Sequence, residues 1–260
     1  MRERACQFGP RASLAGILTE PEGGAPKQAL VLVSAGLTPK FGPFRLYAEL
    51  ARRLSASGFR VLRFDLGGIG DSAPAEDGRG VDERTTQQIA AALDFLSEQG
   101  AHERIVLAGL CSGADDSFRH AAQDSRVTEL VLIDPFAYRT AGFAWRYWSH
   151  RARRRLLRAF KLWHPPAPSG GPALVNYEHV PQPAARELMA RLLARRVAVH
   201  FVYTAGMREH FNHRGQLRAM FRGLELGRRV TLDYLPKLDH TQLLEADRRS
   251  LISTIASRLR

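Results

Sequence analysis

A cysteine with a glycine on either side is the strongest chemical signal in the sequence. The run Gly109-Leu-Cys111-Ser-Gly113 follows a segment typical of a strand and precedes one typical of a helix, which is the pattern of a nucleophile on a sharp turn. The residues two before and two after such a nucleophile must be small to avoid steric conflict, and Gly109 and Gly113 meet that requirement. Ser112 fits the central place badly, because Leu110 would then occupy the preceding small position. Cys111 is therefore the candidate nucleophile.

A thiol in this position is suited to nucleophilic catalysis. The helix expected after Cys111 would point its amino terminus at the sulfur, favouring the thiolate and offering a backbone N–H to an oxyanion. His240 follows the last expected strand, and an imidazole there could take the thiol proton and later return it to a leaving group. The alternative is that Cys111 is a buried, unreactive residue, a common fate of free cysteines.

Strands and helices alternate along the chain and predict the framework that would hold these groups. Short runs rich in Val and Leu are typical of strands buried on both faces, and stretches with apolar residues at helical spacing separate them. The alternation predicts an α/β fold with a doubly wound, mostly parallel sheet, in a single domain covering residues 1–260. The expected strands are 28–35, 60–66, 104–108, 129–133, 197–203 and 229–235, and the expected helices are 47–57, 85–99, 114–122, 187–195 and 245–259.

The connection between the strands at 129–133 and 197–203 is too long for one crossover helix. We expect residues 136–190 to form a helical cap inserted over the site. A basic, aromatic helix at 143–163 dominates this segment, and we favour an arrangement in which its aromatic residues cover a substrate pocket while its arginines face water. The alternative is that this basic amphipathic helix makes a peripheral contact with an anionic membrane.

These motifs together resemble the α/β-hydrolase superfamily, in the branch that contains serine-aminopeptidase-like and monoacylglycerol-lipase-like hydrolases. The sequence is similar above all to bacterial hydrolases associated with exosortase systems, which often carry a cysteine where most relatives carry a serine. The resemblance covers nearly the whole chain except the cap. Besides the turn at Cys111 it rests on Ser34-Ala-Gly36-Leu37, on Arg63-Phe-Asp65-Leu-Gly67-Gly-Ile-Gly70-Asp71-Ser72 and on Asp239-His240.

The resemblance implies two backbone donors for an oxyanion. In relatives one comes from the turn after an early strand, which here is Leu37, and the other from the residue after the nucleophile, which here is Ser112. The glycine-rich run 67–70 lacks the spacing and the directly following helix of a dinucleotide loop. The resemblance makes it a structural loop whose turn is fixed by Asp71 and Ser72.

The acidic partner of His240 stays open. Relatives usually place an aspartate in a Gly-Asp pair shortly after the penultimate strand, and here Met207 follows Gly206. Glu209, two residues further on, and Asp134, at the end of the preceding strand, are equal candidates, and a site without either is the third alternative. A cysteine depends less on such a partner than a serine does, because a thiolate–imidazolium pair can form without it.

Composition and charge indicate where the protein is located and which cofactors and partners are expected. With 45% hydrophobic and 25% charged residues, two cysteines and no apolar run of membrane-spanning length, the chain is expected to be cytoplasmic. No cofactor and no metal is expected, since His200, His210 and His213 have no companion ligands at a known spacing. The net charge of +12 could attract a polyanion, but the arginines are spread along most of the chain and no nucleic-acid partner is expected.

The residues thus predict a hydrolase that cleaves an ester or thioester of a small-molecule acyl substrate through an acyl-enzyme on Cys111. A thioester intermediate suits activated acyl groups better than amides, which makes peptidase activity the least favoured within the class. Two alternatives remain: an acyltransferase that uses the same intermediate, and an inactive scaffold that binds a ligand or partner, for which Met207 is the main argument.

Overall fold

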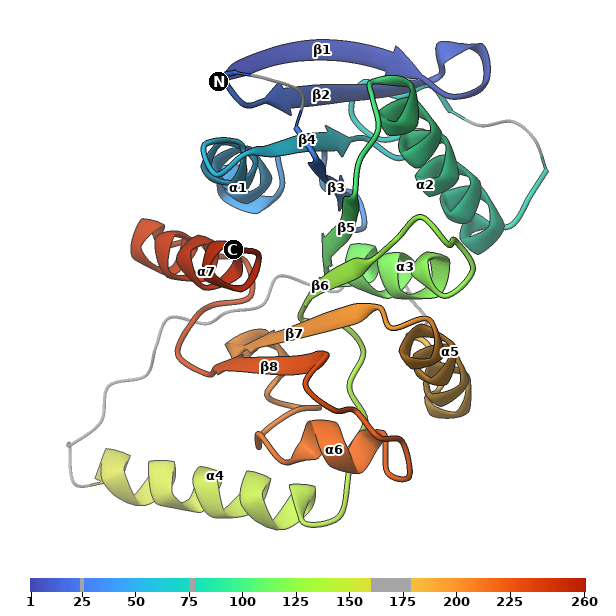
Figure 1. Cartoon of the computed structure of the whole chain (residues 1–260). Coiled ribbons are helices and arrows are strands. Elements are labelled where there is room, and N and C mark those ends of the chain that lie inside the picture. Colours follow the sequence, from blue (N-terminus) through green and yellow to red (C-terminus); the bar gives the residue numbers. More distant parts are fainter. Residues whose placement is uncertain (24–25, 75–77, 160–178) are drawn as a thin grey trace.

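The computed structural model describes residues 1–23, 26–74, 78–159 and 179–260. Its framework is an eight-stranded sheet with the order β1-β2-β4-β3-β5-β6-β7-β8 (Figure 1). β3 to β8 run parallel, whereas β1 and β2 pair antiparallel with their neighbours, so the predicted mostly parallel sheet is confirmed. The strands are β1 (Arg2–Phe8), β2 (Leu14–Glu20), β3 (Gln28–Val33), β4 (Phe59–Phe64), β5 (Arg104–Leu110), β6 (Glu129–Ile133), β7 (Ala198–Thr204) and β8 (Val230–Leu235).

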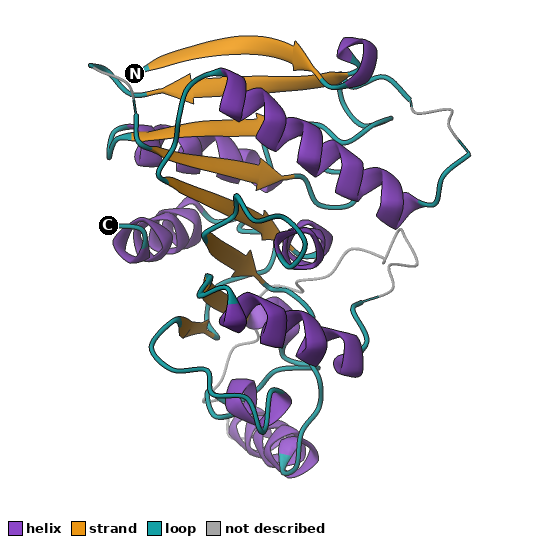
Figure 2. Cartoon of the chain, turned by 45° about the vertical axis from the view of Figure 1, so that its right-hand side comes forward, coloured by secondary structure: helices purple, strands orange, loops and turns teal. Residues whose placement is uncertain are grey.

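Helices cover both faces of this sheet (Figures 1 and 2). One face carries α1 (Leu46–Ser55) and α7 (Glu245–Arg258), which contact each other. The other carries α2 (Val81–Glu98), α3 (Ser112–Ala121) and α5 (Gln182–Ala194). The alternation of strand and helix in the sequence therefore gives the predicted doubly wound arrangement.

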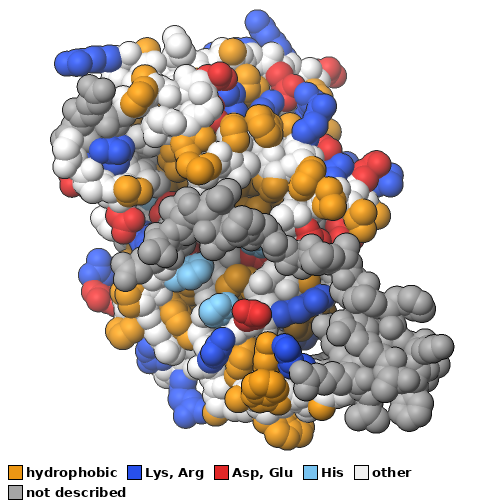
Figure 3. All heavy atoms as spheres, turned by 180° about the vertical axis from the view of Figure 1, so that it is seen from behind, with side chains coloured by type: hydrophobic (Ala, Val, Ile, Leu, Met, Phe, Trp, Pro, Cys, Tyr) orange, Lys and Arg blue, Asp and Glu red, His pale blue; other side chains and the backbone are white. Residues whose placement is uncertain are grey.

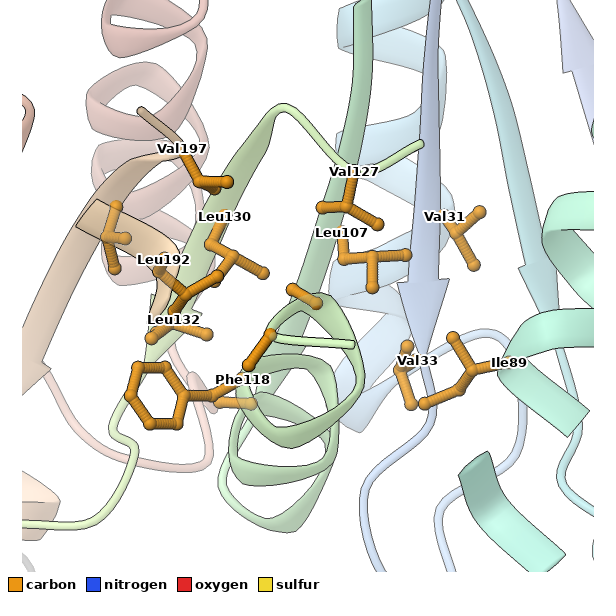
Figure 4. Close-up of a cluster of buried hydrophobic side chains, with 14 of the residues drawn as sticks. Val31, Val33, Ile89, Leu107, Phe118, Val127, Leu130, Leu132, Leu192 and Val197 are labelled. Atoms are coloured by element: carbon orange, nitrogen blue, oxygen red, sulfur yellow. The ribbon is translucent and has the colours of Figure 1, made fainter. Parts of the chain in front are cut away.

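The hydrophobic core lies in two layers, one on each side of the sheet. Along β5, Val106 and Ala108 face α1 and α7, whereas Leu107 faces the opposite layer. Figure 4 shows that second layer, where Phe118 of α3 and Leu192 of α5 lie among the strand residues. Because successive side chains of a strand point to opposite faces, a strand buried on both sides must be apolar throughout.

The amino-terminal hairpin β1–β2 was not among the expected elements. β1 carries charged residues and is exposed at most positions, so it lacks the apolar run that marks the inner strands. Ion pairs attach it to its neighbours: Glu3 accepts from Arg52 (2.8 Å) and Arg63 (3.2 Å). A charged edge of this kind discourages pairing with another chain.

The segment between β6 and β7 contains α4 (Phe143–Ala159) and α5. The predicted insertion of residues 136–190 includes the first part of α5, whose Ala185 and Met189 are fully buried in the core, so this end of the range belongs to the sheet layer. Residues 160–178 of the predicted insertion lie outside the described residues. Within the part of the chain that is described, no helix is long and apolar enough to cross a bilayer.

α4 lies at one end of the molecule, beside the segment around α6 (Gln216–Met220) (Figures 1 and 2). The expectation that its aromatic residues cover a pocket is wrong for Trp145 and Trp148, whose side chains are 76% and 61% exposed. The physical reason is that the helix attaches to the body through Phe143, on its other side, which is buried.

Candidate active site

Cys111 lies on a strained turn at the carboxyl end of β5, directly before α3. Its backbone has φ 53° and ψ −122°, a combination that costs energy for any residue with a side chain and that surrounding contacts must hold. The Cys111 amide donates to the carbonyl of Ile133 on β6 (2.9 Å). The cysteine is only partly buried, which does not fit the alternative of a fully buried, unreactive thiol.

The two glycines of the motif are required by close backbone contacts. A Cβ on Gly109 would lie 2.3 Å from the backbone of Gly113, and a Cβ on Gly113 would lie 2.4 Å from the Val33 carbonyl oxygen. Neither neighbour is a flexible side chain that could move away. The steric reason given for small residues at these positions is confirmed.

The ring of His240 lies between the Cys111 thiol and a carboxylate. Its Nδ1 is 2.7 Å from Oδ2 of Asp134, and the same ring is hydrogen-bonded to Cys111. With Nδ1 held by the carboxylate, Nε2 is the nitrogen left to exchange a proton with the sulfur. Segments far apart in the sequence, after β5, β6 and β8, are thus brought together at the carboxyl edge of the sheet.

Asp134 is fixed in place and fully buried. The backbone N–H of Thr204 donates to its Oδ1 (2.6 Å), and the Thr204 hydroxyl donates to its Oδ2 (2.5 Å). Its φ of 47° lies in the left-handed region, which aspartate tolerates better than most residues. A buried carboxylate with three hydrogen-bond partners has little freedom to turn away from the imidazole.

The electrostatics of the site favour a protonated imidazole. Burial by itself would lower the pKa of His240, but the hydrogen bonds to Asp134 and Cys111, and the attraction of these two acidic groups, raise the pKa to about 10. At neutral pH the ring is therefore an imidazolium ion, and a cation next to a thiol favours the thiolate.

Of the two candidates for the acid, the structure brings only Asp134 to His240. Glu209 is exposed, and its backbone carbonyl accepts from Arg139 (3.0 Å). Met207, at the position where relatives carry the aspartate, is buried in the core.

Gly206 has a steric role next to His240, although the acidic partner of the histidine is Asp134. A Cβ at this position would lie 2.4 Å from the Cβ of His240, so the glycine makes room for the histidine. The glycine of the usual Gly-Asp pair is therefore explained by packing against the ring, independently of the acid that follows it in relatives.

Leu37 and Ser112 also lie at this edge. Leu37 belongs to the turn after β3, which the Thr38 amide closes by donating to the Ala35 carbonyl (2.9 Å). The hydroxyl of Ser112 accepts a hydrogen bond from the Gly36 amide (2.8 Å). The residue after the candidate nucleophile is thereby tied to the turn that holds the second candidate oxyanion donor.

Several residues that support the site were missed in the sequence. The Phe136 amide donates to Asp115 Oδ1 (2.8 Å), and the Phe136 carbonyl accepts from the Tyr203 hydroxyl (2.8 Å), so the chain just beyond Asp134 is held on both sides. Asp115 is fully buried in the first turns of α3. An aspartate in the buried face of a short amphipathic helix was the available signal.

Tyr47 holds together the ends of β3 and β5, the strands that lead into the turns at Leu37 and Cys111. Its hydroxyl donates to the Val33 carbonyl and accepts from the Leu110 amide, both at 2.9 Å. This places one buried hydroxyl between the ends of β3 and β5. Its position in α1 gave no hint of this in the sequence.

The loop after β4 is a structural one, as the resemblance implies. Asp65 is fully buried and accepts from the backbone amide of Lys40 (2.5 Å) and from its Nζ (2.6 Å). A Cβ on Gly70 would lie 2.3 Å from the Asp65 carboxylate, and the Ser72 hydroxyl donates to the Asp65 carbonyl (2.7 Å). Asp71 forms an ion pair with Nζ of Lys40 (2.5 Å).

The three histidines considered as metal ligands are not assembled into one site. His200 contacts Glu129 (2.5 Å) and Thr231 (2.6 Å), whereas His210 and His213 lie beyond β7 at the surface. Across the described ranges, no three His, Cys, Asp or Glu side chains are placed to hold a metal ion.

Comparison with known proteins agrees with this fold. Residues 25–212 match the family described as serine aminopeptidase, S33, so the chain belongs to this family of α/β hydrolases. The family name refers to a serine, whereas the residue on the turn here is a cysteine. The search among curated proteins finds no match.

Solved structures with the same fold are distant in sequence. The chain is similar to an esterase of Pyrococcus furiosus, with a TM-score of 0.61, 14% identity, and 99% and 90% of the two chains covered. A hypothetical protein of Pseudomonas aeruginosa has a TM-score of 0.63 and 17% identity, covering 99% of this chain and 92% of that one. The α/β hydrolase GrgF of a Penicillium species gives 0.61 and 17%, covering 100% and 97%. At these identities the likeness establishes the fold.

Proposed function

We propose that this hydrolase cleaves an ester or thioester through a thioacyl-enzyme on Cys111. The observation that carries the proposal is the His240 ring between the thiol and the Asp134 carboxylate. A nucleophile, a base within hydrogen-bond distance and a third group that orients the base form the arrangement that acyl transfer requires.

In the proposed first step, the Cys111 thiolate attacks the substrate carbonyl carbon and a C–S bond forms. The backbone N–H groups of Leu37 and Ser112 hold the negative oxygen of the tetrahedral intermediate. The bond to the alcohol or thiol then breaks, and the leaving group takes the proton from Nε2 of His240. In the second step water gives a proton to His240 and attacks the thioester, which releases the acid and restores the thiolate–imidazolium pair.

The surface around the site favours an apolar acyl group. Leu37 is 68% exposed, and Leu243 and Leu244, shortly after His240, are 54% and 62% exposed. These side chains come from the two segments that flank the proposed site, after β3 and after β8. Apolar residues at the entrance would stabilise a hydrocarbon chain by removing it from water.

The competing hypotheses are weakened to different degrees. The inactive scaffold rested on Met207 at the usual acid position, and the contact of Asp134 with His240 removes that argument. Acyl transfer differs from hydrolysis only in the acceptor of the second step. The resemblance to hydrolases of exosortase systems remains a prediction about the biological setting.

The test is turnover of a short p-nitrophenyl ester by the whole protein. We expect activity that iodoacetamide abolishes and that Cys111→Ala lacks, and an acyl adduct on the peptide containing Cys111 when the reaction is quenched and analysed by mass spectrometry. Cys6, also partly buried, provides the matched control, and Cys6→Ala should keep activity. An active Cys111→Ala, or an adduct on another residue, would overturn the mechanism.

Two additional substrates separate the alternatives. An aminoacyl p-nitroanilide tests the peptidase activity suggested by the family name, and we expect no turnover, because a thioester is a poor product of amide attack. Adding a competing alcohol or amine that is acylated in preference to water would assign the protein to acyl transfer.

A further inference from the structure

The net positive charge of the protein is concentrated in one part of the chain. Between Asp134 and Glu178 the sequence contains eight arginines and lysines and no acidic residue, whereas the whole protein has a net charge of +12. Six of these arginines belong to α4. A compositional preference for arginine explains many basic residues, but it does not explain the local absence of aspartate and glutamate.

α4 is attached to the body of the protein along one side. Phe143 is buried, its carbonyl accepts from Asn212 Nδ2 (3.1 Å), and its ring stacks with Tyr147 (6.0 Å between centroids). Arg146 Nε donates to Asn212 Oδ1 (3.1 Å). These residues fix which face of the helix is turned outward.

The outward face is aromatic. Trp145, Trp148 and Ala152 are spaced by three and four residues, so they share one face of the helix, and all three are exposed. Arg151 is exposed next to them. Figure 3 shows hydrophobic side chains at the surface beside arginine or lysine side chains at the end of the molecule that carries α4. This is the reverse of an ordinary surface helix, whose apolar stripe faces the core.

We propose that this outward face of α4, formed by Trp145, Trp148, Arg151 and Ala152, docks the protein onto an anionic lipid bilayer. Indole rings are favoured at the membrane interface, where their apolar part leaves water and their N–H stays hydrated. Arginines along the same helix are attracted to anionic headgroups, and their stems can lie on the bilayer surface.

Two features argue against other occupants of this face. The charge of α4 argues against a second copy of the chain, and the exposed indoles argue against duplex nucleic acid. A second copy of the chain docked through the same face would bring two clusters of arginines together without any acidic residue of α4 to pair with them. Nucleic acid would satisfy the arginines, but duplex phosphates need no pair of exposed indoles on the same face. A bilayer of anionic lipid uses both features.

The experiment is flotation of the full-length protein with phosphatidylcholine vesicles and with vesicles that also contain phosphatidylglycerol. We expect binding to the anionic vesicles only, with a loss at about 0.5 M salt, where exposed charges are screened within a few ångströms. Binding is measured also in Cys111→Ala, so that the result does not depend on the proposed activity.

Two variants, each with a matched control, test whether the tryptophans and Arg151 of α4 contribute to vesicle binding. Trp145→Ala/Trp148→Ala should weaken binding by about tenfold or more, whereas Val81→Ala, at a hydrophobic residue 75% exposed on α2, should not. Arg151→Glu should weaken binding by about fivefold or more, whereas Arg228→Glu, with the same change in net charge at another exposed arginine, should have less effect.

Several results would overturn the proposal. With vesicles, these are no binding at all, equal binding to neutral and anionic vesicles, or unchanged binding of the double tryptophan variant. With other partners, they are binding of single-stranded RNA alone through α4, or a dimer in light scattering that only the tryptophan variant loses. Unchanged melting temperature of the variants shows that each fold is intact.

Discussion

Strand β6 has a carboxylate–histidine pair at each of its ends, and the two pairs have different surroundings. At the carboxyl end Asp134 contacts His240 (2.7 Å), and at the amino end Glu129 contacts His200 (2.5 Å). His200 is buried, whereas the side chain of His240 is 32% exposed. Judged by distance alone, either pair could be taken for part of an active site.

The difference lies in the third group. The second nitrogen of His200 contacts the Thr231 hydroxyl (2.6 Å), and Glu129 also accepts from Arg104 (2.6 Å). Burial by itself would raise the pKa of Glu129, but its bonds to His200 and Arg104 lower it below the ordinary value. Every polar group of this pair is satisfied by structural partners, whereas His240 faces a thiol on a strained turn. A histidine–carboxylate pair becomes a candidate site only when a reactive group completes it.

The largest expected effect separates the two histidines. His240→Gln should lower kcat/KM for the ester by about 10²–10⁴-fold, because it removes the group that protonates the leaving group and then takes the proton of water. His200→Gln should keep activity within about twofold and lower the free energy of unfolding by about 1–3 kcal/mol, because it disrupts a buried hydrogen-bond network. Steady-state kinetics and urea denaturation measure the two quantities, and similar losses of activity in both variants would contradict the comparison.

The carboxylates should differ in the same way. Asp134→Asn should reduce kcat by about 10–100-fold, less than in a serine enzyme because thiolate formation depends less on the acid. It should also lower the pKa of His240, so that activity, which needs the imidazolium and is lost as pH rises toward about 10, falls at a lower pH in the variant.

The matched variants are Glu129→Gln and Glu209→Gln. The first should reduce stability by about 1–3 kcal/mol and leave the pH profile of activity unchanged. The second should change neither quantity, since Glu209 is exposed. A loss of activity in Glu209→Gln comparable to that of Asp134→Asn would mean that Glu209, in the segment after β7, is the acidic partner of His240.

A smaller effect is expected at Ser112, whose hydroxyl accepts from the Gly36 amide (2.8 Å). Ser112→Ala should loosen the turn that carries Leu37 and lower kcat by about three- to tenfold with little change in KM, because the oxyanion forms only in the transition state. Ser112→Thr retains the hydroxyl and should recover part of kcat. An unchanged kcat in the alanine variant would mean that this bond does not position the turn.

The smallest effect concerns Asp116, a mostly buried carboxylate that faces Arg119 (3.0 Å). Burial raises the pKa of Asp116 to about 7, against the opposing effect of Arg119. Because the folded state holds this proton more tightly than the unfolded chain, stability falls as pH rises from about 4 to about 7 and stays lower above that. Asp116→Asn should therefore stabilise the protein by about 1 kcal/mol at pH 8 and by less at pH 5. Denaturation at the two pH values checks this, and an equal change at both would be evidence against it.

The inner sheet could be predicted because its strands are apolar on both faces, and the turn at Cys111 because only glycine fits at positions 109 and 113. The edge hairpin could not, because its charged residues form ion pairs with α1 and β4, and the sequence does not show which segments will be its neighbours. The outward direction of Trp145 and Trp148 was also beyond the sequence, since an amphipathic helix shows two faces but not which one meets the body.

The sequence by itself determined the alternation of elements, the position of the thiol between sheet and helix, and the histidine after the last strand, because these depend on local spacing and on steric limits within a few residues. It left the acid undecided between positions 209 and 134. Only the tertiary structure brought Asp134 against His240, because that contact joins the ends of two strands more than a hundred residues apart and depends on the order of strands in the sheet.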